Sequence, residues 1–317
     1  MKTVENTLDC FANSVVAVPP LARREDLSVN PVENRKLIRH IEQGGVTTLM
    51  YGGNANFYGI PLSEYRQVLD HIAAAASDDT WVIPSAGPDY GRLIDQSKIL
   101  REMEFPTAMV LPLRFPATRQ GIETGIRRFA DSFGRPVILY VTSERYLEVA
   151  QIAALIDDGV ASSIKYAVPR ERASDDSFMS DLLSAVERKR VLSGLGEYPA
   201  FDHLREFDLP GFTSGLVCVA PSASTALLHA LKSRSWKVAE RVVNRFAQMD
   251  RLRKEIHPIR VLHDAVTLAG IADMGPILPS LSNLDAKEQA VVREAAKALL
   301  AMDAIPNSTK TGGQAAS

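Results

Sequence analysis

Apolar and polar positions follow two alternating patterns along most of the chain. Short apolar runs bounded by turn signals are separated by longer segments in which apolar residues recur every three or four positions. The short runs predict eight strands, at 14–19, 46–52, 81–87, 107–113, 136–142, 161–167, 190–194 and 211–219. The longer segments predict helices. Ser63 is the expected N-cap of one helix, and Thr142 or Ser143 the expected N-cap of another.

The order of these elements predicts the fold class. Strands that alternate with helices indicate a parallel sheet covered by helices. Eight such units favour a closed (β/α)₈ barrel, because the phosphate-binding motifs GxGxxG and GxxxxGK[ST] of doubly wound sheets are missing. Residues 222–303 show helical patterns only. This segment is longer than the single helix that would be needed to complete the barrel. We therefore predict a barrel domain over 1–221, a C-terminal helical domain over 222–303, and a disordered tail over 304–317.

Composition narrows the function classes. The 317 residues carry a net charge of −2, which gives no electrostatic basis for binding nucleic acid or an acidic membrane surface. No apolar run approaches the roughly 18 residues of a transmembrane helix. The absence of a signal segment, with Cys10 and Cys218 far apart and unpaired, predicts a cytoplasmic location. The six histidines show no ligand spacing, so we expect neither a metal site nor a cofactor.

Two polar residues end neighbouring predicted strands. Lys165 ends the sixth strand, within the small, apolar run "ASSIKYAVP", and Tyr140 ends the fifth. Adjacent strands lie about 4.8 Å apart, so both side chains can reach one cavity. A desolvated lysine has a lowered pKa and can attack a carbonyl carbon to form a Schiff base, while a phenol passes protons. An ordinary ion pair, or a lysine that extends to solvent, fits the position of Lys165 equally well.

Four segments together carry a family resemblance. "PVILYVTSER", "SSIKYA", "LSG" and "GFTSGLVCVAPSASTALLHAL" occur in an order similar to that of the dihydrodipicolinate synthase / N-acetylneuraminate lyase family, over roughly residues 14–302. The resemblance implies a class I aldolase on a (β/α)₈ barrel with a C-terminal helical domain, commonly a homo-oligomer (dimer or tetramer). It implies that Lys165 is the Schiff-base lysine and that Tyr140 relays protons and orients the imine.

The resemblance also implies residues that bind the substrate. The backbone amides of Gly53 and Asn54 would hold the pyruvate carboxylate, and Leu216 would pack over pyruvate. Arg145 would bind a second carboxylate, and Thr142, like Ser143 or Arg114, would contact the distal part of the substrate. Helix capping by Thr142 and Ser143, and a solvated position for Arg145 in the first turn of a helix, remain alternatives.

The chain departs from the family at two places. Gly52-Gly53-Asn54-Ala55-Asn56 replaces the usual Gly-Thr-Thr-Gly-Glu loop, and Pro112-Leu113-Arg114 replaces Pro-Tyr-Tyr. Both changes argue against a biosynthetic dihydrodipicolinate synthase and favour a lyase, an aldolase or dehydratase, acting on pyruvate or a longer 2-oxo acid. The open alternatives are a synthase-type condensation, a catalytically impaired 2-oxo acid-binding barrel, and a glycosidase using Glu144 and Glu197.

Overall fold

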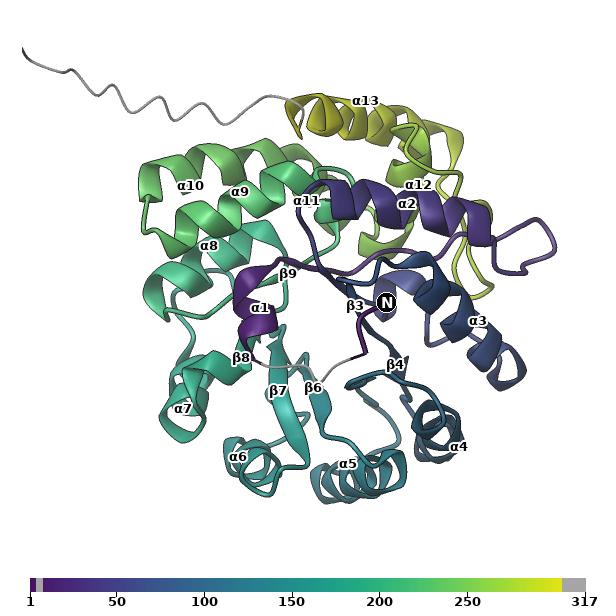
Figure 1. Cartoon of the computed structure of the whole chain (residues 1–317). Coiled ribbons are helices and arrows are strands. Elements are labelled where there is room, and N and C mark those ends of the chain that lie inside the picture. Colours follow the sequence, from purple (N-terminus) through teal and green to yellow (C-terminus); the bar gives the residue numbers. More distant parts are fainter. Residues whose placement is uncertain (4–7, 304–317) are drawn as a thin grey trace, which may run out of the picture.

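The strands of the computed structural model form one closed ring (Figure 1). The structure describes residues 1–3 and 8–303, so the predicted disordered tail lies outside the described residues. The strands are β1 (Val16–Ala17), β2 (Thr48–Met50), β3 (Trp81–Ile83), β4 (Ser85–Ala86), β5 (Met109–Val110), β6 (Val137–Val141), β7 (Ala161–Tyr166), β8 (Val191–Ser193) and β9 (Thr213–Ser214). All pairs are parallel.

Two features of the ring account for its closure. The third predicted strand is divided into β3 and β4 at Pro84, which has no N–H to donate to the ladder. β3 pairs with β2, and β4 pairs with β5, so the ring continues through this point. A parallel bridge between Ser193 and Phe212 joins β8 to β9. The predicted (β/α)₈ barrel is therefore confirmed.

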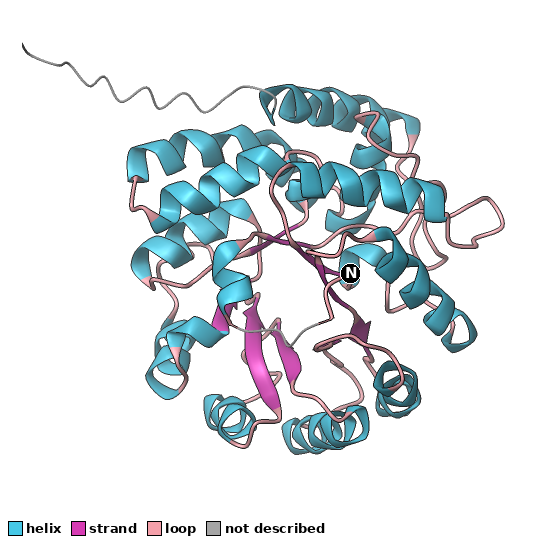
Figure 2. Ribbon diagram, viewed as in Figure 1, coloured by secondary structure: helices cyan, strands magenta, loops and turns pink. Residues whose placement is uncertain are grey.

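Eight helices follow the strands in turn and surround them (Figure 2). They are α2 (Pro31–Gln43), α3 (Leu62–Ala75), α4 (Tyr90–Arg101), α5 (Arg119–Phe133), α6 (Val149–Asp157), α7 (Ser177–Ala185), α8 (Glu197–Glu206) and α9 (Pro221–Lys232). α9 packs against both α8 and α2 and so completes the ring. The predicted domain boundary at residue 221 falls at the start of this eighth helix, and the division into domains stays a prediction.

Two predicted helix caps are wrong. α3 begins at Leu62, directly after Pro61, whose fixed φ suits a helix start, and Ser63 lies inside the first turn. α6 begins at Val149, where the Gln151 side chain accepts a hydrogen bond from the Glu148 amide at 3.1 Å. This capping box leaves no capping role for Thr142 or Ser143, which lie in the preceding loop.

The remaining helices lie before β1 and after the ring. They are α1 (Asp9–Asn13), α10 (Trp236–Val243), α11 (Ala247–Glu255), α12 (Pro258–Leu268) and α13 (Ala286–Asp303), with short 3₁₀ turns η1 (Gly53–Ala55), η2 (Arg188–Arg190), η3 (Leu216–Cys218) and η4 (Asn244–Phe246). α12 packs against η1, which follows β2. Asp303 accepts a hydrogen bond from the Ala223 amide in the first turn of α9 at 2.7 Å. The C-terminal helices thus contact the end of the barrel where its loops follow the strands.

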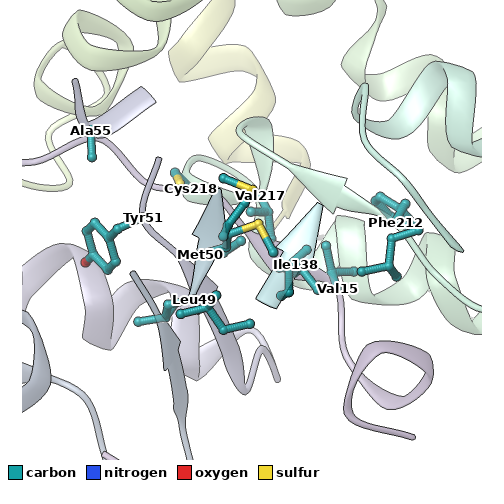
Figure 3. Close-up of a cluster of buried hydrophobic side chains, with 14 of the residues drawn as sticks. Val15, Leu49, Met50, Tyr51, Ala55, Ile138, Phe212, Val217 and Cys218 are labelled. Atoms are coloured by element: carbon teal, nitrogen blue, oxygen red, sulfur yellow. The ribbon is translucent and has the colours of Figure 1, made fainter. Parts of the chain in front are cut away.

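The core extends from the barrel interior to the surrounding helices. The strands are buried almost throughout, as expected of parallel strands with helices outside and packed side chains inside. Figure 3 shows part of this core, with Leu49, Met50, Ile138, Phe212 and Val217 among the buried side chains. Within the described ranges, no helix has the length and apolar character needed to cross a bilayer.

Candidate active site

Lys165 and Tyr140 are direct neighbours on adjacent strands. The register of β6 and β7 pairs Tyr140 with Lys165, and two residues earlier it pairs Ile138 with Ser163. The Lys165 Nζ atom lies 4.4 Å from the centroid of the Tyr140 ring, which is the geometry of a cation–π contact. The predicted approach of these two side chains is therefore present in the structure.

The Lys165 amine is buried without an ionic partner. The residue is 4% exposed, and in the described part of the chain no carboxylate oxygen lies within 4.0 Å of Nζ. Burial lowers the pKa of Lys165 to about 7, and the positive charge of Arg253 lowers it too. Neither an ion pair nor an extended, solvated lysine describes this side chain. A large fraction of the amine is unprotonated near neutral pH.

Tyr140 keeps its proton under the same conditions. Burial raises the pKa of the phenol, while the charges of Arg114 and Arg253 act in the opposite direction. Tyr58 lies near enough for its own pKa to be raised mainly by burial and then by Tyr140. A neutral phenol beside a largely neutral amine can donate a proton to an oxygen atom that leaves during imine formation. This catalytic role of Tyr140 stays a prediction.

Two backbone amides of the loop after β2 have no acceptor within residues 1–3 and 8–303. The Gly52 carbonyl accepts hydrogen bonds from the amides of Ala55 and Phe57, at 3.2 Å each, and this closes η1 into a tight turn. Among the described residues, no acceptor is found for the amides of Gly53 and Asn54. A Cβ atom at Gly52 would lie 2.8 Å from the terminal methyl group of Met109, so a larger residue there would require this flexible side chain to shift. The free amides fit the predicted carboxylate site, whose function is untested.

A cationic cavity lies at the ends of three strands. It has a volume of about 470 Å³ and is lined by residues that follow β5, β6 and β7: Leu113, Arg114, Ala117, Arg119, Ile122, Thr142, Ser143, Arg145, Tyr146 and Pro169. Ser143 accepts a hydrogen bond from the Arg145 amide at 3.2 Å. Arg145 is exposed and precedes α6, so the first-turn interpretation is wrong. Neither Tyr140 nor Lys165 is among the lining residues, so the cavity does not contain the amine.

Leu216 and Glu197 are both buried near the end of β9. Leu216 is the first residue of η3 and is 1% exposed. Glu197, at the start of α8, accepts hydrogen bonds from Ser214 at 2.5 Å and Ser224 at 2.6 Å. Burial raises the pKa of Glu197, whereas these hydroxyl groups lower it. Glu197 is the first residue of α8 and is 2% exposed. The contact of Leu216 with a substrate stays a prediction.

Arg253 is a member of this site that the sequence did not reveal. It belongs to α11 in the C-terminal helices, yet its charge acts on Lys165, Tyr140 and Glu197. Met249, Leu252 and Ile256 form the inward face of α11, and Arg253 lies four residues after Met249 on this face. A cation within an apolar helical stripe was the available signal. It becomes specific only when the fold is known.

The described residues contain no group of three His, Cys, Asp or Glu side chains that could hold a metal ion. The groups that the site presents are the Lys165 amine, the Tyr140 phenol, backbone amides and guanidinium groups. Cys218 is a buried free thiol whose pKa is raised by burial. The side chain of Cys10 lies outside the described residues.

Comparisons with known proteins identify chains that are similar in sequence or in fold. No known family profile matches the chain. A probable 5-dehydro-4-deoxyglucarate dehydratase from Acinetobacter baumannii (strain AB307-0294) is 22% identical over 243 residues, which are 74% of this chain and 77% of the relative. The dihydrodipicolinate synthase of Agrobacterium tumefaciens aligns with a TM-score of 0.82 and 16% identity, over 93% of this chain and 100% of that one. The chain has the fold of this synthase.

A second solved structure extends the comparison to an aldolase. The sialic acid aldolase of Ruminococcus gnavus aligns with a TM-score of 0.78 and 12% identity, over 91% of this chain and 97% of that one. The resemblance predicted from strand-end residues is thus confirmed at the level of the fold. Synthase, aldolase and dehydratase appear among the similar proteins, so the fold alone does not select one reaction.

Proposed function

We propose that this protein is a lyase that forms a Schiff base between Lys165 and the keto carbon of a 2-oxo acid. The observation that carries the proposal is the buried Lys165 amine, with a pKa of about 7, placed 4.4 Å from the Tyr140 ring. The fold supports it, because the R. gnavus sialic acid aldolase with the same architecture is known in a form described as a catalytic lysine mutant.

The reaction begins with attack of the neutral Lys165 amine on carbon 2 of the substrate. The carbonyl oxygen becomes a hydroxyl group, takes up a proton through Tyr140 and leaves as water, giving a protonated imine. The imine accepts the electron pair of a bond at carbon 3. Either the C4 hydroxyl group loses its proton, the C3–C4 bond breaks and an aldehyde leaves, and the resulting enamine takes up a proton at carbon 3, or a C3 proton is removed and a hydroxyl group leaves from carbon 4. Water then adds to the imine and releases the product from Lys165.

The cationic cavity supports a substrate longer than pyruvate. Arg114 and Arg145 line it, and Thr142 and Ser143 supply hydroxyl groups. A second anionic group on the substrate would bind there through charge-assisted hydrogen bonds. The Acinetobacter relative is named for 5-dehydro-4-deoxyglucarate, a sugar acid with a carboxylate at each end. We therefore favour aldol cleavage or dehydration of a dicarboxylic 2-oxo acid, with synthase-type condensation on pyruvate as the alternative.

The test is reductive trapping. The protein is incubated with pyruvate or with dicarboxylic 2-oxo acids, sodium borohydride is added, and the mass of the intact chain is measured. One covalent adduct per chain is expected, and Lys165→Met should abolish it. Lys98→Met is the matched control, because Lys98 is an exposed helical lysine paired with Asp95. No adduct across the 2-oxo acids would refute the proposal.

The other interpretations predict different results in the same samples. An impaired barrel would show a thermal shift with 2-oxo acids but no adduct. A glycosidase would need two free acids, whereas Glu144 is paired with Arg170 and Glu197 is held by two hydroxyl groups. Neither acid has the surroundings of a paired catalytic carboxylate.

We also infer that the chain forms homo-oligomers. Phe115 is 86% exposed and Tyr90 is 47% exposed, and both line an apolar cavity of about 610 Å³. A second copy of the chain would cover these large apolar side chains. Light scattering should give a dimer or tetramer mass, and Phe115→Asp should lower it. A monomeric wild-type protein would contradict the inference. A cytoplasmic location stays a prediction.

A further inference from the structure

Arg253 has N–H groups at the mouth of the barrel that are not used in hydrogen bonds within the described residues. Its Nε donates to the Pro258 carbonyl at 3.1 Å, which fixes the guanidinium relative to the start of α12. In the part of the chain that the structure describes, neither Nη atom has a hydrogen-bond acceptor, and no carboxylate oxygen lies within 4.0 Å. The side chain is partly exposed. The two Nη atoms are therefore available to a ligand.

Gly215 lies where Arg253 and Asn54 approach one another. A Cβ atom at position 215 would lie 3.2 Å from Arg253 Nη2 and 2.9 Å from Asn54 Nδ2. Arg253 Nη2 and Asn54 Nδ2 therefore both pack against Gly215, one from the C-terminal helices and the other from the loop after β2. The Asn54 side chain is held by its hydrogen bond to the Val18 carbonyl at 2.8 Å. The free amides of Gly53 and Asn54 belong to the same turn.

The charge at this point lacks a close counter-ion. Arg253 lowers the pKa of Lys165, so the two cations disfavour one another. Glu197 attracts Arg253, but from beyond 4.0 Å, and its Oε1 atom already accepts from Ser214 and Ser224. An unpaired cation beside a buried amine is unfavourable in the free protein, and an anion with good hydrogen bonds offsets that cost.

We propose that Arg253 binds the carboxylate of the 2-oxo acid that Lys165 attacks, between its guanidinium and the Gly53–Asn54 turn. This assignment rests on the proposed Schiff-base function. The loop here lacks the two hydroxyl residues expected from the family, and Arg253 supplies a charged donor in their place. A guanidinium presents two parallel N–H groups to a carboxylate, which orients the adjacent keto carbon toward Nζ.

Borohydride trapping with an acid and its ester tests this assignment. Pyruvate and methyl pyruvate share the keto group, but only pyruvate has the carboxylate. The concentration that gives half-maximal trapping is measured for each compound in wild type and Arg253→Met. The ratio of the two concentrations cancels any change in the protonation of Lys165. Wild type should prefer pyruvate, and Arg253→Met should reduce that preference about 10- to 100-fold, since charged hydrogen bonds contribute about 1.5–3 kcal/mol.

Three further variants make the result specific. Arg251→Met removes an exposed guanidinium from the same helix, where it pairs with Glu255, and should leave the preference unchanged. Arg253→Lys keeps the charge without the two-pronged geometry and should restore only part of the preference. Arg253→Gln provides a second neutral variant if Arg253→Met folds poorly, and trapping of methyl pyruvate shows that each site remains folded.

The outcomes distinguish this assignment from the proposed function. An unchanged preference for pyruvate in Arg253→Met and Arg253→Gln, with adducts still formed, would overturn the role of Arg253 alone. A purely structural Arg253 would give this result together with a lower melting temperature. Absence of adducts in wild type with either compound would instead refute the Schiff-base function.

Discussion

The candidate site combines residues from two regions of the molecule: Tyr140 and Lys165 from the barrel strands, and Arg253 from the C-terminal helices. Tyr140 and Lys165 are set by strand register: each is the last but one residue of its strand, β6 or β7, and the two are paired across one ladder. Arg253 comes from α11, and only the packing of the C-terminal helices brings it to the barrel mouth. The strands position the amine and the phenol, whereas the helices supply a charge that lowers the pKa of the amine. The pKa of Lys165 thus depends on both regions.

The largest effect should come from altering the strand residues of the site, Tyr140 and Lys165. Tyr140→Phe removes the phenolic hydroxyl and keeps the ring over which the Lys165 Nζ atom lies. Proton transfer by a positioned group is worth about 10²–10⁴ in rate, so single-turnover adduct formation should slow by about that factor. Stopped-flow or quenched trapping measures the rate. Tyr198→Phe, which removes an exposed hydroxyl bonded to Asn244, is the control. A rate within about threefold of wild type would remove Tyr140 from the mechanism.

Tyr140 and Lys165 could be predicted from the sequence because their placement depends on short stretches of sequence around each of them. A lone lysine in an apolar run and a tyrosine at the end of the preceding strand needed only strand periodicity and the rule that barrel sites lie at strand ends. The eight strands were found for the same reason. The capping errors at Ser63 and Thr142 arose where several helix starts fitted the pattern and a proline or a capping box selected another.

Arg253 could not be predicted in this way. Nothing within "MDRLRKEI" separates Arg253 from Arg251 or Lys254, which carry similar charges in the same helix. Arg251 pairs with Glu255, and Lys254 pairs with Asp250, on exposed faces of α11. Arg253 differs only in the direction it faces, and that direction has meaning only once α11 and α12 pack onto the barrel. The depressed pKa of Lys165 depends on the same tertiary contacts.

A second experiment uses the free energy of unfolding to test how strongly the fold lowers the pKa of Lys165. A lysine whose pKa is about 7 when folded and 10.5 when unfolded is a burden on the fold below pH 7, because the unfolded chain binds the proton more tightly. This difference corresponds to roughly 5 kcal/mol at pH 6. Lys165→Met should therefore raise the free energy of unfolding at pH 6, by at most about 5 kcal/mol.

Urea denaturation at pH 6 and pH 10 measures this effect. The advantage of Lys165→Met should shrink as pH rises from about 7 toward 10.5, since the wild-type amine is then neutral in the folded state and increasingly neutral in the unfolded state. Lys98→Met serves again as the control, and its stability should stay within about 0.5 kcal/mol of wild type at both pH values. A destabilised Lys165→Met at pH 6 would show that the amine is better solvated than its burial indicates.

The smallest expected effect is a shift in the pH dependence of adduct formation, which tests the influence of Arg253 on Lys165. In wild type, adduct formation should increase with pH through a midpoint near 7, because only the unprotonated Lys165 amine attacks. Arg253→Met removes a positive charge that disfavours the protonated amine, so the midpoint should move to higher pH. It should remain below 10.5, because burial is the larger cause of the lowered pKa and persists in the variant. The rate of methyl pyruvate trapping between pH 5 and 10 gives the midpoint without interference from carboxylate binding. A midpoint that moves to lower pH, or does not move, would show that Arg253 on α11 does not lower the pKa of Lys165.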